Sequence, residues 1–300
     1  MRLTALYRDT RPDVLHGHGS KGGAYARLAT WPVFDGTAIR VYTPHGGSFN
    51  YDKGTLGHPI YMAAEKSLER RTDVFLFESQ YARDRFDRYV GHTDKVVRVV
   101  HNGIADSEFE PIARDADPFD LVYIGELRDA KGIDTLLDAL ALIRQGGGER
   151  LTLLCVGAGP DEGSLKARAR DAGVWDSVAF VPPQPIRDAL SRARVMVVPS
   201  RMESLPYVIL EAAAARQPLI ATRVGGIPEI FGALSDELIP SSDPPALAER
   251  IRTVLSETPE ARDGRAAQLS GQVRARFDIG AMVRGGLDAY EAGFAARGLS

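Results

Sequence analysis

The sequence lacks several features that would assign it to particular classes of protein. Cysteine occurs once in 300 residues, as Cys155 in the apolar run LTLLCVG, so the chain cannot form an internal disulfide and a reducing cytoplasm is expected. The formal net charge is only −3, which offers no electrostatic case for binding nucleic acid. No apolar run approaches the roughly 18 residues that span a bilayer, and the first residues do not form a signal peptide. We therefore expect a cytoplasmic protein, with peripheral contact at the inner face of the membrane left open.

The sequence does contain a regular alternation of short apolar runs and helical patterns, which is typical of an α/β fold with parallel sheets. Its 44% apolar and 26% charged residues fit one large or two medium-sized globular domains. The predicted strands are 13–17, 38–43, 73–78, 95–100, 119–124, 151–156, 178–181, 195–199 and 218–222, with a weaker candidate at 237–239. The predicted helices are 133–145, 161–172, 186–193, 205–215, 244–256, 260–276 and 279–296.

A polar stretch divides the strands into two series. Residues 101–120, HNGIADSEFEPIARDADPFD, have no sustained period and read as an interdomain linker. We predict two Rossmann-like domains, 1–110 and 111–278, and a helix in 279–300 whose apolar stripe crosses back to the first domain. The first domain has only four predicted strands and opens directly on a helix, so its front part is expected to be missing.

The segment SRMESLPYVILEAAAARQPLIATRVGGIPEIF places Glu203 and Glu211 eight positions apart among mostly apolar residues. A carboxylate buried without a partner costs several kcal/mol, so ligand binding is the interpretation that we favour. Pro206 marks the first helical turn and leaves Glu211 about 7 Å further along the axis, at ~1.5 Å per residue. Two such acceptors suit the hydroxyl groups of one long ligand. The alternatives are a charge near a helix N-terminus for Glu203 and an ion pair with Arg216 or Arg223 for Glu211.

Two glycine-containing turns indicate a phosphate-binding edge of the second sheet. In YIGELRDAKGIDTLLDAL a strand leads into Gly125, and Arg128 and Lys131 precede an amphipathic helix. Cations beside a helix N-terminus suit a diphosphate, and the alternative is a solvated turn. In TRVGGIPEIF two glycines precede Pro228 and would let a backbone approach a ligand, although a tight strand-to-helix turn explains this segment alone better.

Three histidines lie on or just after predicted strands of the first domain. His45 lies in the turn VYTPHGG, and His16 and His18 lie two apart on one side of a strand. No carboxylate or thiolate stands at ligand spacing, so a metal site is not favoured. We expect a polar contact between His45 and a substrate, and the alternative is an exposed turn histidine.

Taken in this order, these segments resemble the retaining family 4 glycosyltransferases of the GT-B fold. The resemblance covers essentially the whole chain. It rests on the segments DVLHGHGSKGGAYARLA, VYTPHGG, RRTDVFLFESQYARDRF, VVHNGI, GELRDAKG, ESLPYVILE, GGIPE and FDIGAMVRGGLDAY. The fold that it implies is two Rossmann-like domains facing across a cleft, the first on the acceptor side and the second binding a nucleotide sugar.

The resemblance also implies roles for matching residues on the donor side. Lys131 would neutralise the diphosphate of the donor, and Glu211 would hold the ribose of its nucleotide. Glu203, together with backbone groups of Ser204 and Leu205, would hold the donor sugar. The nucleotide sugar is a co-substrate in this scheme, and no metal cofactor is implied.

The implied activity is that of a retaining, hexosyltransferase-type glycosyltransferase in surface polysaccharide or glycolipid assembly. It would move a sugar from a nucleotide diphosphate to a hydroxyl group of a glycan or lipid-linked acceptor. His45 would contact sugar or acceptor and, with Glu203, would form the catalytic pair. Cations and helix N-termini would stabilise the leaving diphosphate, which would itself take the proton of the incoming hydroxyl.

Three departures from the family pattern affect this prediction. Glu126 follows Gly125 where the family usually has arginine, so we assign the second phosphate contact to Arg128. Glu203 is followed by Ser-Leu-Pro rather than the common Gly-Phe-Gly, and the family's first strand and glycine loop lie upstream of Met1. We therefore expect this 300-residue form to be a poor enzyme that proteases cut before residue 112. The alternatives are a non-catalytic nucleotide-sugar-binding or partner subunit and, less favoured, a GT-B epimerase.

Overall fold

The computed structural model describes residues 2–29, 38–45 and 57–299, and the chain forms two compact units. Unit 1 combines Met1–Gly103 with Ile279–Ser300, and unit 2 is Ile104–Asp278. The predicted boundaries lay after residues 110 and 278. Each unit is described by itself.

Unit 1 contains a parallel sheet of four strands in the order β1-β2-β3-β4. In this sheet His16 is opposite Val41 and His18 is opposite Thr43, so the carboxyl ends of β1 and β2 meet at one edge. The strands are β1 (Val14–His18), β2 (Ile39–Thr43), β3 (Val74–Phe77) and β4 (Val96–Val99). The helices of unit 1 are α1 (Arg2–Thr10), α2 (Gly19–Leu28), α3 (Gly57–Glu69), α4 (Gln80–Tyr89) and α12 (Ile279–Ala296).

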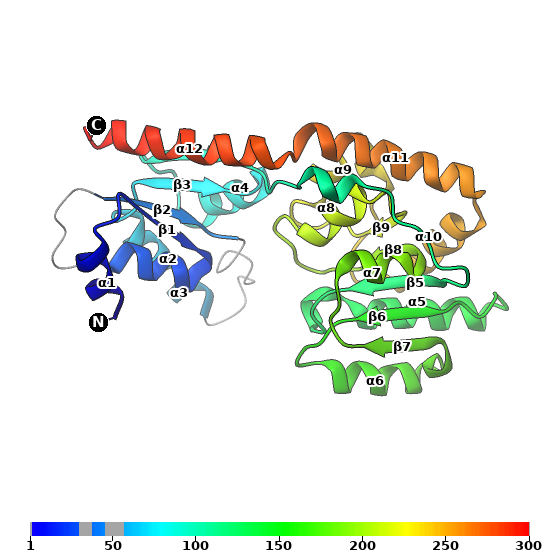
Figure 1. The fold of residues 1–300 in the computed structure, drawn as a ribbon. Helices are drawn as coiled ribbons and strands as arrows, with labels where there is room; N and C mark the ends of the chain where they lie inside the picture. Colours follow the sequence, from blue (N-terminus) through cyan, green and yellow to red (C-terminus); the bar gives the residue numbers. More distant parts are fainter. Residues whose placement is uncertain (1, 30–37, 46–56, 300) are drawn as a thin grey trace. The chain divides into compact units, whose positions relative to one another are not determined.

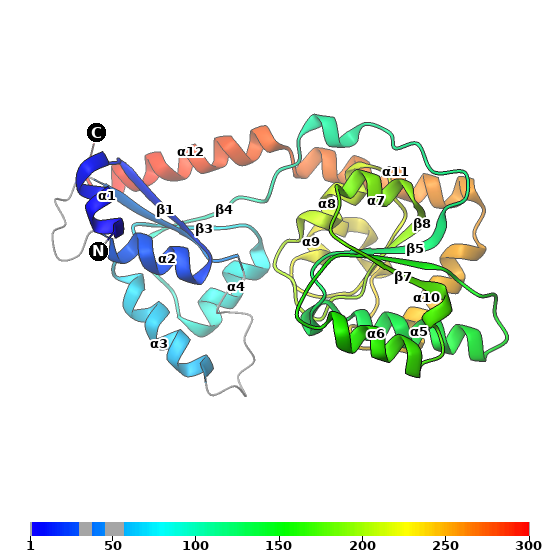
Figure 2. The ribbon, with the colours of Figure 1, turned by 60° about the horizontal axis from the view of Figure 1, so that its bottom comes forward.

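The two faces of this sheet are covered by different parts of the chain. Alternate side chains point to opposite faces of a strand, and here Phe75 and Phe77 pack against Phe86 of α4. Val41 and Val74 point to the other face and pack against residues of α12. The last helix therefore lies along the sheet of unit 1, as Figure 2 shows.

Unit 2 contains a parallel sheet of five strands in the order β7-β6-β5-β8-β9. The strands are β5 (Phe119–Ile124), β6 (Leu153–Val156), β7 (Val178–Val181), β8 (Ala193–Val198) and β9 (Leu219–Ala221). The α-helices are α5 (Ile133–Gln145), α6 (Glu162–Asp171), α7 (Ile186–Ser191), α8 (Tyr207–Ala214), α9 (Ile227–Phe231), α10 (Pro244–Ser256) and α11 (Pro259–Arg276). Short 3₁₀ helices are η2 (Asp106–Phe109), η3 (Asp129–Lys131), η4 (Trp175–Ser177) and η5 (Gly232–Glu237).

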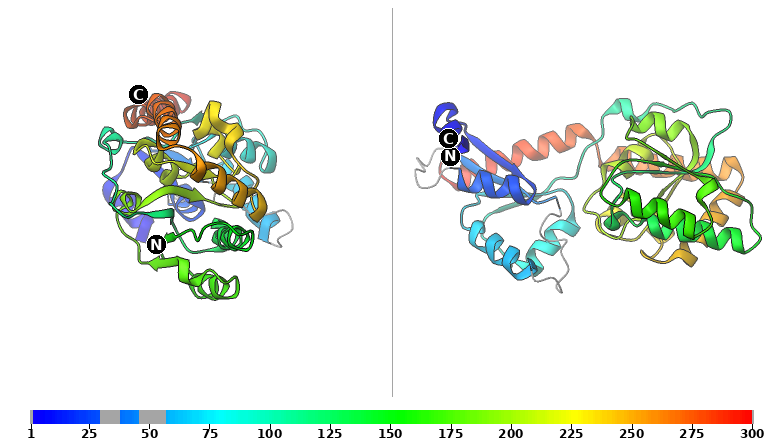
Figure 3. Two further views of the ribbon diagram at one scale, coloured as in Figure 1. Left: turned by 90° about the vertical axis from the view of Figure 1, so that its right-hand side faces the viewer. Right: turned by 90° about the horizontal axis from the view of Figure 1, so that it is seen from below.

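Helices cover both faces of the sheet in unit 2, so its strands are apolar at successive positions. Leu121, Leu153 and Val195 pack on the side of α5, α6 and α10. Val122 and Met196, one position further along, pack on the side of α7, α8, α9 and α11. The two helical layers can be followed in Figures 1 and 3.

The strand order reverses direction at β5. Strands β6 and β7 follow on one side of it, whereas β8 and β9 follow on the other. In a doubly wound sheet, ligands bind beyond the carboxyl ends of the strands at such a reversal. The loops after β5 and β8 therefore define where a site is expected.

The structure confirms the predicted α/β class with two Rossmann-like units. Two local predictions were wrong. Residues 237–239 form no strand, because Ile239 makes only an isolated bridge to Thr222. The stretch 101–120 is not an interdomain linker along its whole length: the boundary between the units falls after Gly103, and beyond it Ile104 and Phe109 are buried in the core of unit 2.

Candidate functional site

A cavity of about 410 Å³ lies at the carboxyl ends of β5 and β8, at the reversal of strand order. Its walls come from the end of β5, from η3, from the loop after β8 and from the first turns of α8. Four of its side chains carry charge: one lysine and three glutamates. The lining residues are Tyr123, Ile124, Gly125, Glu126, Lys131, Ile186, Val198, Ser200, Glu203, Pro206, Tyr207, Val208 and Glu211.

Glu203 is held in place by two groups on this wall. The ammonium group of Lys131 lies 2.7 Å from Glu203 Oε1, and the hydroxyl of Ser200 donates to the same oxygen at 2.7 Å. Glu203 is only 8% exposed, so the lysine compensates a charge that would be costly alone. Lys131 has three N–H donors and gives one to this contact, which leaves it able to bind an anion as well.

Two glycines allow the loops around Glu203 to meet. Gly132 has φ of +67°, and a Cβ there would lie 2.1 Å from the carbonyl oxygen of Pro199. Gly225 has φ of +58°, and its Cβ would lie 2.0 Å from the carbonyl oxygen of Glu203. The N–H of Gly226 then donates to the Ser204 carbonyl at 2.6 Å. The GGIPE segment therefore supports the glutamate loop directly, which the prediction of a tight turn did not anticipate.

Glu211 lies in the second turn of α8 and is half-buried at the cavity wall. Burial raises the pKa of its carboxyl group above the ordinary value, and the charge of Glu108 adds to this effect. Among the described residues it forms no ion pair with Arg216 or Arg223, and Arg223 instead lies 3.5 Å from Asp236. The ion-pair alternative for this glutamate is therefore wrong.

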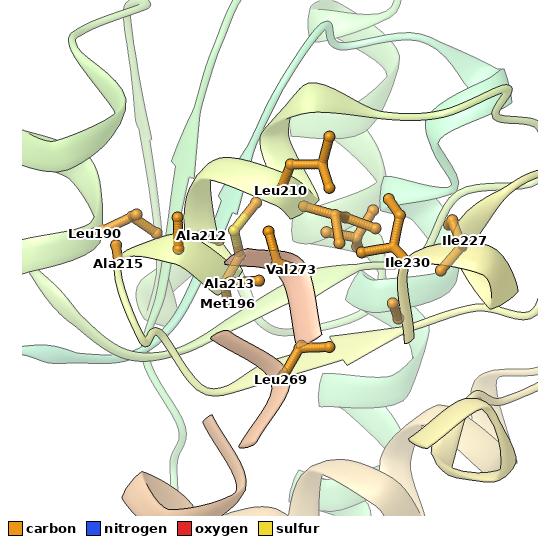
Figure 4. Close-up of a cluster of buried hydrophobic side chains, with 14 of the residues drawn as sticks. Leu190, Met196, Leu210, Ala212, Ala213, Ala215, Ile227, Ile230, Leu269 and Val273 are labelled. Carbon is orange, nitrogen blue, oxygen red and sulfur yellow. The ribbon is translucent and has the colours of Figure 1, made fainter. Parts of the chain in front are cut away.

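The other side of α8 anchors it to the core. Figure 4 shows Leu210 and Ala213 of this helix among the buried side chains that include Leu269 and Val273 of α11. The helix is thus fixed by apolar packing on one side, and this packing positions Glu211 at the cavity on the other.

Three further predicted site residues do not line this cavity. Arg128 borders a separate acidic depression with Asp129 and Asp161, and its guanidinium group lies 3.4 Å from Glu126. Arg128 precedes η3 and Lys131 ends it, and of the two only Lys131 lines the cavity. Ser204 and Leu205 lie next to the cavity in sequence, but Leu205 is buried in the core.

The predicted histidines form a cluster in unit 1. His45 Nε2 lies 2.8 Å from His18 Nδ1, and the ring of His16 stacks on that of His18 with centroids 4.1 Å apart. His16 is in turn within hydrogen-bonding distance of Thr43 and of Tyr290 on α12.

Sequence reasoning missed four residues of these two sites. Ser200 and Tyr207 flank the predicted Glu203 segment and carry no distinctive spacing. Thr43 and Tyr290 contact His16 from strand β2 and from a helix 274 positions away. An apolar stripe containing Tyr290 was visible in the sequence, but its hydroxyl contact was not.

Two features are absent from the described ranges 2–29, 38–45 and 57–299. These ranges contain no cluster of three or more His, Cys, Asp or Glu side chains placed to hold a metal ion. They also contain no helix that combines the length and the apolar character required to cross a bilayer.

Two Rossmann-like units and a polar cavity at the strand reversal of the second are the features of the GT-B class of glycosyltransferases, which use nucleotide-sugar donors. A family model described as "Glycosyl transferases group 1" matches residues 105–268, more than half of the chain. A second, described as "Glycosyltransferase Family 4", matches residues 1–108. The chain belongs to the glycosyl transferases of group 1, and the predicted resemblance is confirmed.

Individual relatives agree with this assignment. Glycogen synthase of Mycobacterium tuberculosis is 29% identical over 289 residues, covering 93% of this chain and 69% of that protein. The structure of sucrose-phosphate synthase from Thermosynechococcus elongatus is 25% identical with a TM-score of 0.82, covering 97% of this chain and 76% of that one. HepE of Anabaena, solved with UDP and glucose, has a TM-score of 0.82 at 17% identity, covering 97% and 81%, and shows the likeness of the fold alone.

Proposed function

We propose that this protein transfers a sugar from a nucleotide diphosphate to a hydroxyl group of a glycan or glycolipid acceptor with retention of configuration. The observation that carries this proposal is the convergence of Lys131, Glu203 and Glu211 on one cavity at the strand reversal of unit 2. A cation beside two carboxylate acceptors complements a ligand that has a diphosphate and several hydroxyl groups.

In this scheme each lining residue binds a different part of the donor. Lys131 binds the diphosphate, Glu211 accepts hydrogen bonds from the ribose hydroxyls, and Glu203 accepts them from the sugar. The backbone of Ser204 and Leu205 borders the sugar. Because Ser200 and Lys131 both contact one oxygen of Glu203, its second oxygen is oriented for the ligand.

The transfer step requires no group beyond the donor, the acceptor and these side chains. The bond between the anomeric carbon and the phosphate oxygen breaks while the acceptor oxygen bonds to the same face of that carbon. The acceptor proton passes to the leaving phosphate oxygen, and Lys131 together with backbone N–H groups offsets the charge that develops there. We propose that no metal ion takes part, that Arg128 contributes long-range charge rather than contact, and that His45 of unit 1 serves the acceptor.

Titration calorimetry tests the donor assignment. UDP and GDP are each titrated into the protein with and without EDTA, and binding of at least one that EDTA leaves unchanged is expected. Failure of every nucleoside diphosphate to bind would overturn the assignment of the cavity, and loss of binding in EDTA would overturn metal independence.

The stereochemical part needs a separate measurement. The anomeric configuration of the product sugar, determined by NMR from its coupling constants, is expected to match that of the donor. A product of opposite configuration would contradict the retaining mechanism while leaving the donor site intact.

A further inference from the structure

The histidine cluster of unit 1 has an internal order that the proposed function does not use. His16 is saturated: its Nδ1 lies 2.7 Å from the Tyr290 hydroxyl and its Nε2 lies 2.8 Å from the Thr43 hydroxyl. Neither ring nitrogen remains for a ligand. His16 can therefore act on a substrate only through the groups that it touches.

Besides the hydroxyl groups of Tyr290 and Thr43, His16 contacts the ring of His18. The two rings stack at 4.1 Å with an interplanar angle of 29°, which fixes the plane of His18. His18 Nδ1 is then 2.8 Å from His45 Nε2, and the backbone of His45 adopts a left-handed φ of +51° that a non-glycine residue seldom takes. Within residues 2–29, 38–45 and 57–299, no side chain or backbone group pairs with His18 Nε2 or His45 Nδ1.

The charge of the cluster follows from its surroundings. Burial lowers the pKa of His16 to about 4, with the charges of His18 and His45 acting in the same direction. Burial and His45 also lower the pKa of His18, against the opposing charge of Glu78 just after β3. Tyr290 on α12 also contacts the cluster, and burial raises its pKa, so it stays neutral. At neutral pH, His16 and His18 therefore carry no charge.

When neither imidazole is protonated, the hydrogen-bonded pair of His18 and His45 has a definite hydrogen-bonding capacity. Each ring carries one N–H and one lone pair, and one N–H···N bond between the rings uses one of each. The two remaining nitrogens therefore present one donor and one acceptor, whichever ring donates. An alcohol hydroxyl both accepts and donates, so it satisfies this pair, whereas a phosphate dianion or an ammonium group satisfies only half of it.

We propose that the His18–His45 pair binds a neutral hydroxyl group of the acceptor, and that Tyr290 and Thr43 are positioning residues that hold this pair through His16. This inference rests on the proposed function, because it specifies the acceptor side of that reaction. It adds two residues from distant parts of the chain and a preference for uncharged hydroxyls over phosphate at this point.

Histidine NMR on the whole protein tests the positioning role without any transfer reaction. The imidazole nitrogens are labelled with ¹⁵N, and Tyr290→Phe and Thr43→Val each remove one partner of His16. We expect His16 to occupy one tautomer in the wild type and a mixture in either variant, with the ¹⁵N shifts of His18 changing too. The matched control is Tyr25→Phe, because Tyr25 is 64% exposed on α2 and should leave all three rings unchanged.

D-Glucose and D-glucose 6-phosphate are then titrated as neutral and anionic probes. We expect glucose to shift His18 Nε2 and His45 Nδ1, and Tyr290→Phe to weaken that binding about fivefold, as loss of one positioning hydrogen bond would. If His16 keeps the same single tautomer in both variants, the positioning role is wrong. A response of the pair to neither probe, or to the phosphate group alone, would overturn the ligand class. Nucleotide binding in unit 2 is measured independently, so its failure would reject the proposed function while these NMR results stood.

Discussion

Replacing Glu211 with glutamine is expected to weaken nucleotide binding while making the protein more stable at neutral pH. The carboxylate lies at the wall of the donor cavity, and α8 is anchored by apolar residues on its other side. A hydrogen bond to a charged group contributes about 1.5–3 kcal/mol, so loss of one corresponds to about 10- to 150-fold in Kd. Glutamine keeps one acceptor oxygen, so we expect the lower end for Glu211→Gln and the upper end for Glu211→Ala.

The effect on stability has the opposite sign because of the raised pKa of Glu211. Burial raises this pKa above the ordinary 4.5, so over the interval between the two values the folded protein binds more protons than the unfolded chain. Stability then falls as pH rises through that interval, and glutamine removes this loss. Glu211→Gln should therefore melt at a higher temperature than the wild type at pH 8, and the difference should vanish well below about pH 4.

Calorimetric titration with UDP and GDP measures the affinity, and thermal melting from pH 4 to pH 8 measures the stability. Glu149→Gln in the exposed loop after α5 is the matched control and should change neither. A Glu211→Gln variant that binds nucleotide as tightly as the wild type and melts at a lower temperature would refute the reasoning. Glu211 would then be a structural residue and not a ligand-binding one.

Three further predictions, two of them with a control substitution, test other parts of the structure. Gly225→Ala should lower the free energy of unfolding by about 1–2 kcal/mol because of its positive φ, and further because its Cβ would overlap the Glu203 carbonyl. The same variant should bind UDP-glucose less tightly, with a smaller loss for UDP. As the control, Gly271→Ala in α11 has nothing near its Cβ and should raise the free energy of unfolding in urea by about 0.5–1 kcal/mol. Gly293→Ala would bring a Cβ within 2.5 Å of the Val74 side chain and should destabilise unit 1 by about 1–3 kcal/mol. Gly286→Ala on the same helix has nothing near its Cβ and should not destabilise unit 1. Equal effects of the two substitutions would contradict the packing of α12. Because the pKa of His16 is lowered to about 4, the unfolded chain binds more protons between there and pH 6.5, so acidification should remove about 3 kcal/mol of stability. His16→Asn should flatten this slope of the free energy of unfolding against pH, and an unchanged slope would show that other groups cause it.

Helices and strands could be predicted where a strong hydrophobic periodicity was bounded by a clear start or stop residue such as glycine. The helix 133–145 follows from Gly132 and from apolar residues at helical spacing, and the structure has the same bounds for α5. Glu203 and Lys131 were expected at one edge because parallel strands place their carboxyl ends together, and the structure joins them at 2.7 Å.

The failures have physical causes of a different kind. The stretch 101–120 is polar and has no period, yet Ile104 and Phe109 are enough to attach it to the core. Arg128 and Lys131 are three positions apart, but Arg128 is the extended residue before the 3₁₀ helix η3 and Lys131 is the last residue of that helix, and only Lys131 lines the cavity. The contact between His16 and Tyr290 depends on packing between residues 274 positions apart, which no local pattern encodes.

Unit 1 is assembled from two segments that flank unit 2 in the sequence, whereas unit 2 is one continuous segment. During synthesis, unit 2 can therefore fold as soon as Asp278 has left the ribosome. The sheet of unit 1 must wait for α12, which is translated after the whole of unit 2, before Val41 and Val74 are covered. Each newly made molecule thus passes through a stage with a finished second half and an open apolar sheet in the first. A premature stop codon within the last helix would fix the chain at that stage, as a substrate for chaperones and proteases.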